Sequence, residues 1–150
     1  MKTEIRTAVV SAIVAVLSFP VVAGELDLLS ALETRDIESA RINLNPWGAH
    51  LGFEMEIAGD DLGLAALVSV VRDAEPAQGH KCANRGAIRF RMSGEEAIAV
   101  GLLPSHSEGF YDLRLYRDER VEGVYRVRRA ALLAALEELG VPKDDPAFKE

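Results

Sequence analysis

His80 and Cys82 are the two residues in this sequence whose types and spacing best suit metal chemistry. In an extended chain, residues two positions apart point to the same side, so both side chains can face one ion. His106 would supply a third ligand and His50 a fourth. Imidazole and thiolate ligands suit zinc or copper, so the sequence predicts a transition-metal site as one alternative. The other alternative is a small buried thiol accompanied by ordinary loop histidines.

A thiolate beside an imidazolium is also an activated nucleophile, which gives Cys82 a second chemical interpretation. The sequence offers no glycine-rich oxyanion loop next to it, and no Gly-x-Ser-x-Gly, phosphate-loop or dinucleotide-binding motif elsewhere. An exposed thiol also oxidises readily in an oxidising compartment. We therefore predict no catalytic residue and expect a protein that is not an enzyme.

Arginines are the second feature that could bind a partner. Residues 81–129 hold ten Lys and Arg against seven carboxylates, whereas residues 24–80 hold three against eleven. Within the predicted meander, the arginines that alternation places on the solvent side are Arg89, Arg91, Arg114 and Arg126. Such a face predicts a binding surface for a protein partner or a small anionic ligand. Alternatively, the arginine stems cover apolar neighbours, and Asp112 and Glu122 neutralise their charges.

Residues 1–23 have the three-part pattern of an export signal. Lys2 and Arg6 precede a run of apolar and small residues over 7–19, and short side chains come before a cut after Ala23. We expect removal of this segment, which would leave a periplasmic or extracellular protein with no stable membrane span. The alternative is a retained anchor, since the run approaches the roughly 20 apolar residues that a spanning helix needs.

The chain that remains after cleavage is acidic. Cleavage removes two basic residues and one acidic residue, which leaves 15 basic against 23 acidic side chains and a formal net charge of −8. This balance argues against general binding to nucleic acids or anionic membranes. Cys82 is the only cysteine, so no disulfide forms within the chain and stability must come from packing. We expect one globular domain over 24–141 and a polar C-terminal tail over 142–150.

Alternation of apolar and polar residues predicts six strands. The segments are 38–44, 49–57, 88–92, 98–102, 111–115 and 121–127. We expect the first two to pair as a hairpin around the turn at 45–48, and the last four to form an antiparallel meander.

Helical spacing of apolar residues predicts three helices. The first covers 25–34, and the second begins after the N-cap signal Asp60-Asp61, although its valine-rich end is also compatible with a strand. The third covers 132–139 and ends at Gly140. The predicted fold class is therefore α+β, with helices covering one face of a mostly antiparallel sheet.

These observations favour a small exported, non-enzymatic domain that engages a protein partner or anionic ligand through its arginine-rich sheet face. The alternative is an exported protein that binds zinc or copper through His80, Cys82 and His106. A thiol enzyme built on Cys82 is the third hypothesis. The pattern supports no nucleic-acid partner.

Overall fold

The computed structural model describes residues 32, 37–45, 52–94, 97–104 and 106–149. The predicted export signal, the predicted first helix apart from Leu32, and the hairpin turn beyond Asn45 lie outside these residues. Within the described ranges, no helix has the length and apolar character needed to cross a membrane.

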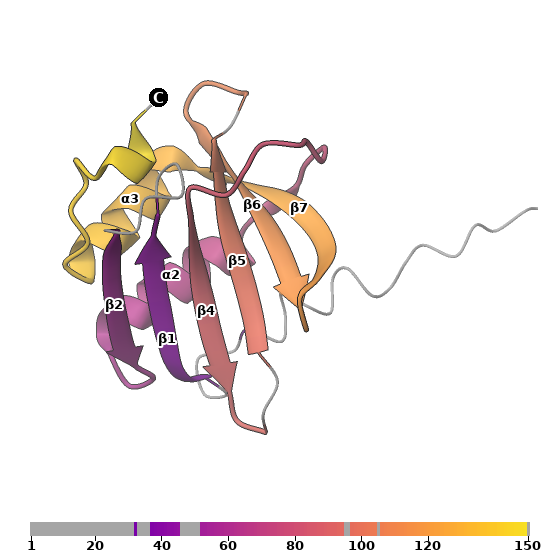
Figure 1. The fold of residues 1–150 in the computed structure, drawn as a ribbon. Helices are drawn as coiled ribbons and strands as arrows, with labels where there is room; N and C mark the ends of the chain where they lie inside the picture. The colour runs from indigo at the N-terminus through magenta and orange to yellow at the C-terminus, as the bar shows by residue number, and fades with distance from the viewer. Residues whose placement is uncertain (1–31, 33–36, 46–51, 95–96, 105, 150) are drawn as a thin grey trace, which may run out of the picture.

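The described residues form one sheet of seven strands in which every neighbouring pair is antiparallel (Figure 1). The strands are β1 (Ile37–Leu44), β2 (Phe53–Ala58), β3 (Glu75–Pro76), β4 (Gly86–Met92), β5 (Ala97–Pro104), β6 (Phe110–Arg117) and β7 (Arg120–Arg128). Their order across the sheet is β2-β1-β4-β5-β6-β7-β3. The prediction of an α+β fold with a mostly antiparallel sheet is confirmed.

Alternation along the strands separates a core side from a solvent side. In β4, Ile88 and Phe90 are fully buried whereas Arg89 and Arg91 are exposed. Burial of a large apolar side chain contributes about 1.5–3 kcal/mol, so this alternation fixes which face of the strand points inward.

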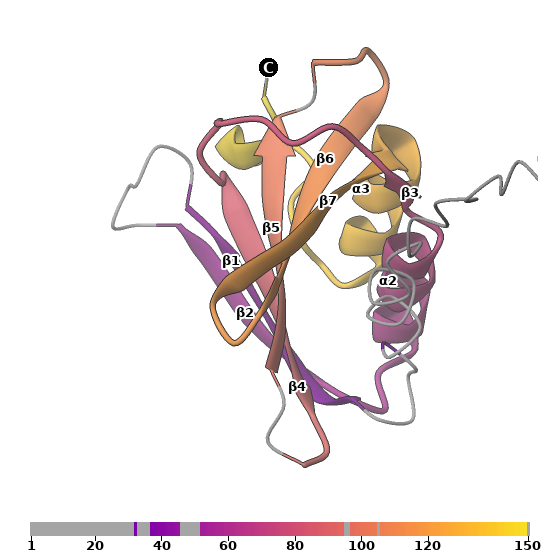
Figure 2. The same ribbon diagram turned by 90° about the vertical axis from the view of Figure 1, so that its right-hand side faces the viewer.

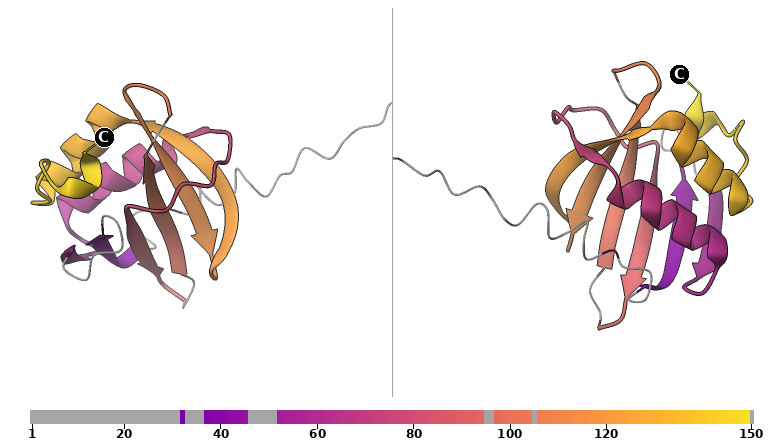
Figure 3. Two further views of the ribbon diagram at one scale, coloured as in Figure 1. Left: turned by 45° about the horizontal axis from the view of Figure 1, so that its top comes forward. Right: turned by 180° about the vertical axis from the view of Figure 1, so that it is seen from behind.

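Two helices in the described part of the chain pack against the core side of the sheet. They are α2 (Leu62–Arg72) and α3 (Arg129–Glu138), which lie together on one side of the sheet in Figure 2 and in front of the strands in the right-hand view of Figure 3, which is seen from behind. The side chain of Asp61 caps α2 by accepting a 2.8 Å hydrogen bond from the backbone of Gly63. The apolar stripe predicted for this helix is buried, and its valine-rich end is helical rather than extended.

The predicted end of the last helix is also observed. Gly140 has a φ of +84°, and the backbone N–H of Val141 donates to the carbonyl of Leu136 at 3.0 Å. The N–H of Gly140 donates to the carbonyl of Glu137 at 2.9 Å, which completes a Schellman motif.

The C-terminal residues differ from the polar tail expected over 142–150. A 3-10 turn, η3 (Pro146–Phe148), buries Phe148 to 2% exposure. The Phe148 ring meets the Tyr111 ring edge to face at a centroid distance of 5.9 Å. One aromatic residue in a polar segment produces no periodicity, so the sequence pattern did not reveal this docking.

Residues 77–85, the crossing segment, connect the edge strand β3 to the central strand β4. The segment passes over the sheet on the face away from the helices (Figures 1 and 2). Ala77 N–H donates to the carbonyl of Val124, and Arg85 N–H donates to that of Leu102, at 2.9 and 2.8 Å. The crossing segment therefore covers part of the sheet face that lies away from the helices.

The crossing segment also packs closely on β5. A Cβ added at Gly101 would lie 2.6 Å from the side-chain amide of Asn84, which donates a 3.0 Å hydrogen bond to the Tyr116 hydroxyl. We expect Gly101→Ala to displace the Asn84 side chain, break that hydrogen bond and lower the free energy of unfolding by about 0.5–1.5 kcal/mol, measured by urea denaturation. Gly79→Ala is the control, because its nearest neighbour would be 3.8 Å away. Equal stability of the two variants would contradict this packing.

Candidate metal centre

The structure brings His80, Cys82 and His106 together. The first two come from the crossing segment, and His106 comes from the connection between β5 and β6. The Cys82 sulfur lies 3.5 Å from Nε2 of His106, and the ligand atoms of all three residues lie within 4.8 Å of one another. The fourth ligand suggested by the sequence, His50, lies outside the described residues.

These separations are close to those of a bound ion. Zinc–nitrogen and zinc–sulfur bonds of 2.0–2.3 Å in tetrahedral geometry put neighbouring ligand atoms about 3.3–3.6 Å apart. The Cys82–His106 separation already falls in this range. The widest separation within the group, at most 4.8 Å, would have to shorten by about 1 Å. Small side-chain rotations are enough for that change.

Asp112 holds the His80 ring in one orientation. Nε2 of His80 lies 3.1 Å from Oδ2 of Asp112, and this carboxylate is 1% exposed. Its other oxygen, Oδ1, accepts a 3.0 Å hydrogen bond from Nε of Arg126. An ionised carboxylate can only accept, so the proton of a neutral His80 ring belongs on Nε2.

The Asp112 contact leaves Nδ1 of His80 with a bare lone pair. This nitrogen is buried and has no hydrogen-bond partner in the part of the chain that the structure describes. Histidines that bind metals usually donate their second ring N–H to a carboxylate or carbonyl, which orients the ring and fixes the tautomer. A buried, unpartnered Nδ1, on a histidine that lies close to a thiol and to a second imidazole ring, is therefore the arrangement expected of a metal ligand.

The same geometry fits a thiol nucleophile less well. A catalytic Cys–His pair normally has a third group that orients the imidazole. Here the carboxylate orients His80, whereas the imidazole nearest to the sulfur is His106. His106 meets the His80 ring only edge to face, at a centroid distance of 4.9 Å. Asp112 therefore orients His80, and not His106, the ring that contacts the Cys82 sulfur and would have to act as its base.

Two of the four arginines predicted to bind a ligand contact this cluster from within the protein. Arg114 donates to the backbone carbonyls of His80 and Cys82, at 2.7 and 3.2 Å. Arg126 contacts Asp112, as the neutralisation alternative anticipated. These contacts hold the crossing segment and the carboxylate in place, so both guanidinium groups support the cluster.

The other two predicted arginines lie farther along the sheet face, on β4. Arg91 forms an exposed ion pair with Glu38 at 3.3 Å. Arg89 is exposed and has no hydrogen bond or ion pair with any residue that the structure describes. The four arginines are therefore unequal: three have intramolecular partners and Arg89 is available to an external one.

The role of Asp112 towards His80 was not predicted from the sequence. Its position between the buried residues Tyr111 and Leu113 identified it only as an outward-facing strand residue. It is buried together with Leu103, its neighbour across β5 and β6, on the face that the crossing segment passes over. That cover is a tertiary feature, and no local pattern in the sequence indicates it.

No family model, curated protein or solved structure matches the chain.

Proposed function

We propose that this chain is an exported, non-enzymatic protein that binds zinc or copper through His80, Cys82 and His106. The observation that carries the proposal is the convergence of three ligand atoms within 4.8 Å, together with the Asp112 carboxylate that contacts Nε2 of His80. Export rests on the signal pattern of residues 1–23. Storage, delivery or sensing of the metal are the roles that such a protein would serve.

The donor set determines the class of metal. Two imidazoles and one thiolate suit zinc and copper, whereas magnesium and calcium prefer oxygen ligands. Three protein ligands leave one tetrahedral position for water or for a donor from a partner. His106 is exposed and Cys82 is half-buried, so that position is accessible from solvent.

The second candidate function is recognition of an anionic ligand or protein partner by the sheet face. We propose that the sheet consists of a hairpin of β1 and β2 joined to a meander of β4 to β7, with helices on one face and the recognition surface on the other face, beside the crossing segment. The observation that favours this function is the exposed, unpartnered Arg89, as judged within the described residues. This function does not depend on the metal, because Arg89 makes no contact with the cluster.

Metal loading tests the leading proposal. Protein purified without an affinity tag should contain, or take up, one zinc or copper ion per chain in elemental analysis. Substitution with cobalt(II) should give a thiolate-to-metal charge-transfer absorption, which reports the sulfur ligand directly. Lys81→Gln is the matched control, because Lys81 lies between two proposed ligands with its side chain exposed.

Alkylation of Cys82 separates the metal site from a thiol enzyme. Bound zinc should protect the thiol from iodoacetamide, and a chelator should restore its reaction. A protein that refuses both zinc and copper would contradict the leading proposal. Rapid alkylation that zinc does not slow would instead favour the nucleophile.

A further inference from the structure

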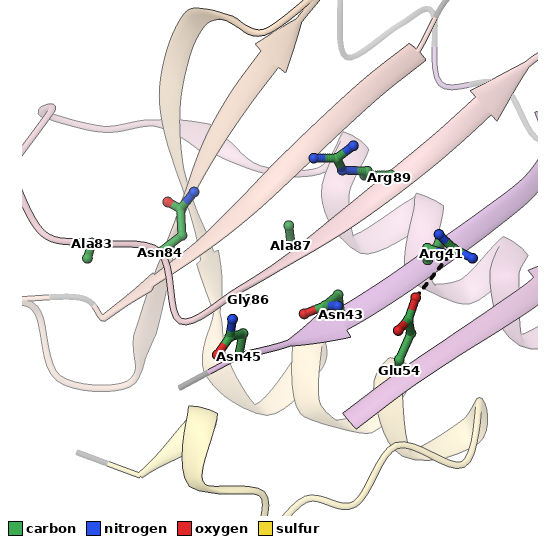
Figure 4. Close-up of a pocket in the computed structure, with 9 residues that line it drawn as sticks. All are labelled: Arg41, Asn43, Asn45, Glu54, Ala83, Asn84, Gly86, Ala87 and Arg89. Carbon is green, nitrogen blue, oxygen red and sulfur yellow. Dashed lines mark ion pairs between the residues drawn. The ribbon is translucent and has the colours of Figure 1, made fainter. Parts of the chain in front are cut away.

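Two adjoining hollows lie on the sheet face beside the crossing segment. The first has a volume of about 500 Å³ and lies over β1 and β4, with the lining residues shown in Figure 4. The second has a volume of about 540 Å³ and extends over β5 to the end of β6. Both are lined by Asn84, Ala87 and Arg89, so these residues lie where the hollows meet. Volumes of this size suit a small molecule.

Alanines make the room in the second hollow. Ala87, Ala97 and Ala99 line it, and Gly101, the partner of Ala87 across β4 and β5, has no side chain. Arg89 and Ala99 are direct partners across β4 and β5. A large side chain at Ala99 would fill the space beside the guanidinium, so the short one leaves Arg89 open to a ligand.

Arg89 forms no ion pair with any residue in the described part of the chain. Its partner across β1 and β4 is another arginine, Arg41, and like charges at directly opposite positions destabilise a sheet. Arg41 contacts the carboxylates of Glu54 and Glu56 at 3.2 and 3.9 Å. Arg89 has no such partner among the residues that the structure describes. A bound carboxylate would offset the repulsion, and a guanidinium can hold it through two parallel hydrogen bonds.

Groups of the opposite charge line the same hollow. Asp118 and Glu119 belong to the turn between β6 and β7, are exposed, and form no ion pair within the described ranges. Tyr116 lies on the wall, where its hydroxyl oxygen accepts the hydrogen bond from Asn84. Its own O–H therefore stays able to donate to a ligand. The hollow thus presents a cation, two carboxylates and a hydroxyl donor above a floor of alanines.

We infer that this hollow binds a short peptide with free termini. The peptide carboxylate would lie on Arg89, its ammonium group would face Asp118 and Glu119, and a peptide carbonyl would accept from Tyr116. An extended dipeptide spans about 7 Å, which a hollow of this volume accommodates. The inference rests on the second candidate function and narrows it to one class of ligand.

Calorimetric titration with three forms of one dipeptide tests the inference. Alanyl-alanine should bind, whereas N-acetyl-alanyl-alanine and alanyl-alanine amide should each bind at least about tenfold more weakly, because each lacks one charged end. Arg89→Gln should weaken alanyl-alanine binding by a similar factor. So should the double variant Asp118→Asn, Glu119→Gln. Arg91→Gln should leave the affinity unchanged, because Arg91 lies on the same face of the same strand and is paired with Glu38.

The contrary outcomes distinguish failure of the peptide assignment from failure of the anion-binding face. If acetate and the acetylated peptide bind as well as alanyl-alanine and still need Arg89, the peptide assignment is wrong while the anion-binding face stands. If no form binds, or if Arg89→Gln has no effect, both are wrong. Each titration is run with zinc and again with a chelator, so that the metal proposal is judged separately.

Discussion

Cys82→Ser is expected to lower the affinity for zinc by at least about a hundredfold, which corresponds to about 2.7 kcal/mol. Serine preserves the size of the side chain but replaces a soft thiolate by a hydroxyl, a poor ligand for zinc and copper. The wild-type protein should gain about 2.7 kcal/mol of stability when free zinc is a hundred times its dissociation constant. The variant should gain at most about 0.4 kcal/mol at the same concentration.

Thermal or urea unfolding with and without zinc measures this difference. Lys81→Gln should keep the full zinc-dependent gain, which shows that a change in the crossing segment alone does not abolish binding. A Cys82→Ser protein that zinc stabilises as strongly as the wild type would contradict the proposed site.

Asp112→Asn is expected to reduce zinc affinity by about 10–100-fold while the fold is retained. The carboxylate accepts hydrogen bonds from both His80 and Arg126, whereas an amide has a single acceptor oxygen. If Arg126 keeps that oxygen, the amide N–H group faces Nε2 of His80. The ring must then carry its proton on Nδ1, the nitrogen assigned to the metal.

Asp112→Ala should have a larger effect on stability. It removes the common partner of His80 and Arg126, whose side chains are 14% and 31% exposed. We expect the free energy of unfolding to fall by about 3 kcal/mol, the lower end of the range for a broken buried pair, because Arg126 keeps part of its hydration. Urea denaturation gives the stability, and cobalt titration gives the affinity. Unchanged metal affinity in Asp112→Asn would show that the carboxylate does not set the His80 tautomer.

The regular elements could be predicted because each carries its own local signal. Alternation in β4 placed Phe90 inside and Arg89 outside, and the structure has the same arrangement. The stop signal at Gly140 was equally local, since a positive φ suits glycine. Convergence of His80 and Cys82 with His106 was a hypothesis from side-chain chemistry alone.

The contacts that complete the site could not be predicted, because they join residues far apart in the sequence. His80 and Asp112 are 32 positions apart, and they meet only because the crossing segment runs over β6. Because the segment takes this path, Arg114 donates a hydrogen bond to the backbone carbonyl of His80 instead of to solvent. Alternation shows on which face a side chain lies, but it does not show what covers that face.

The route of the crossing segment also has a consequence for the order of folding. The segment lies against β5, β6 and β7, which come later in the chain, so it can settle only after those strands have formed beneath it. We expect a metal ion that ties the segment to the β5–β6 connection to act after the rate-limiting barrier, because the strands beneath must first place its ligands. Interactions formed after the transition state mainly slow unfolding and leave the folding rate nearly unchanged. Metal in this protein would therefore lengthen the lifetime of the native state instead of helping the chain to reach it.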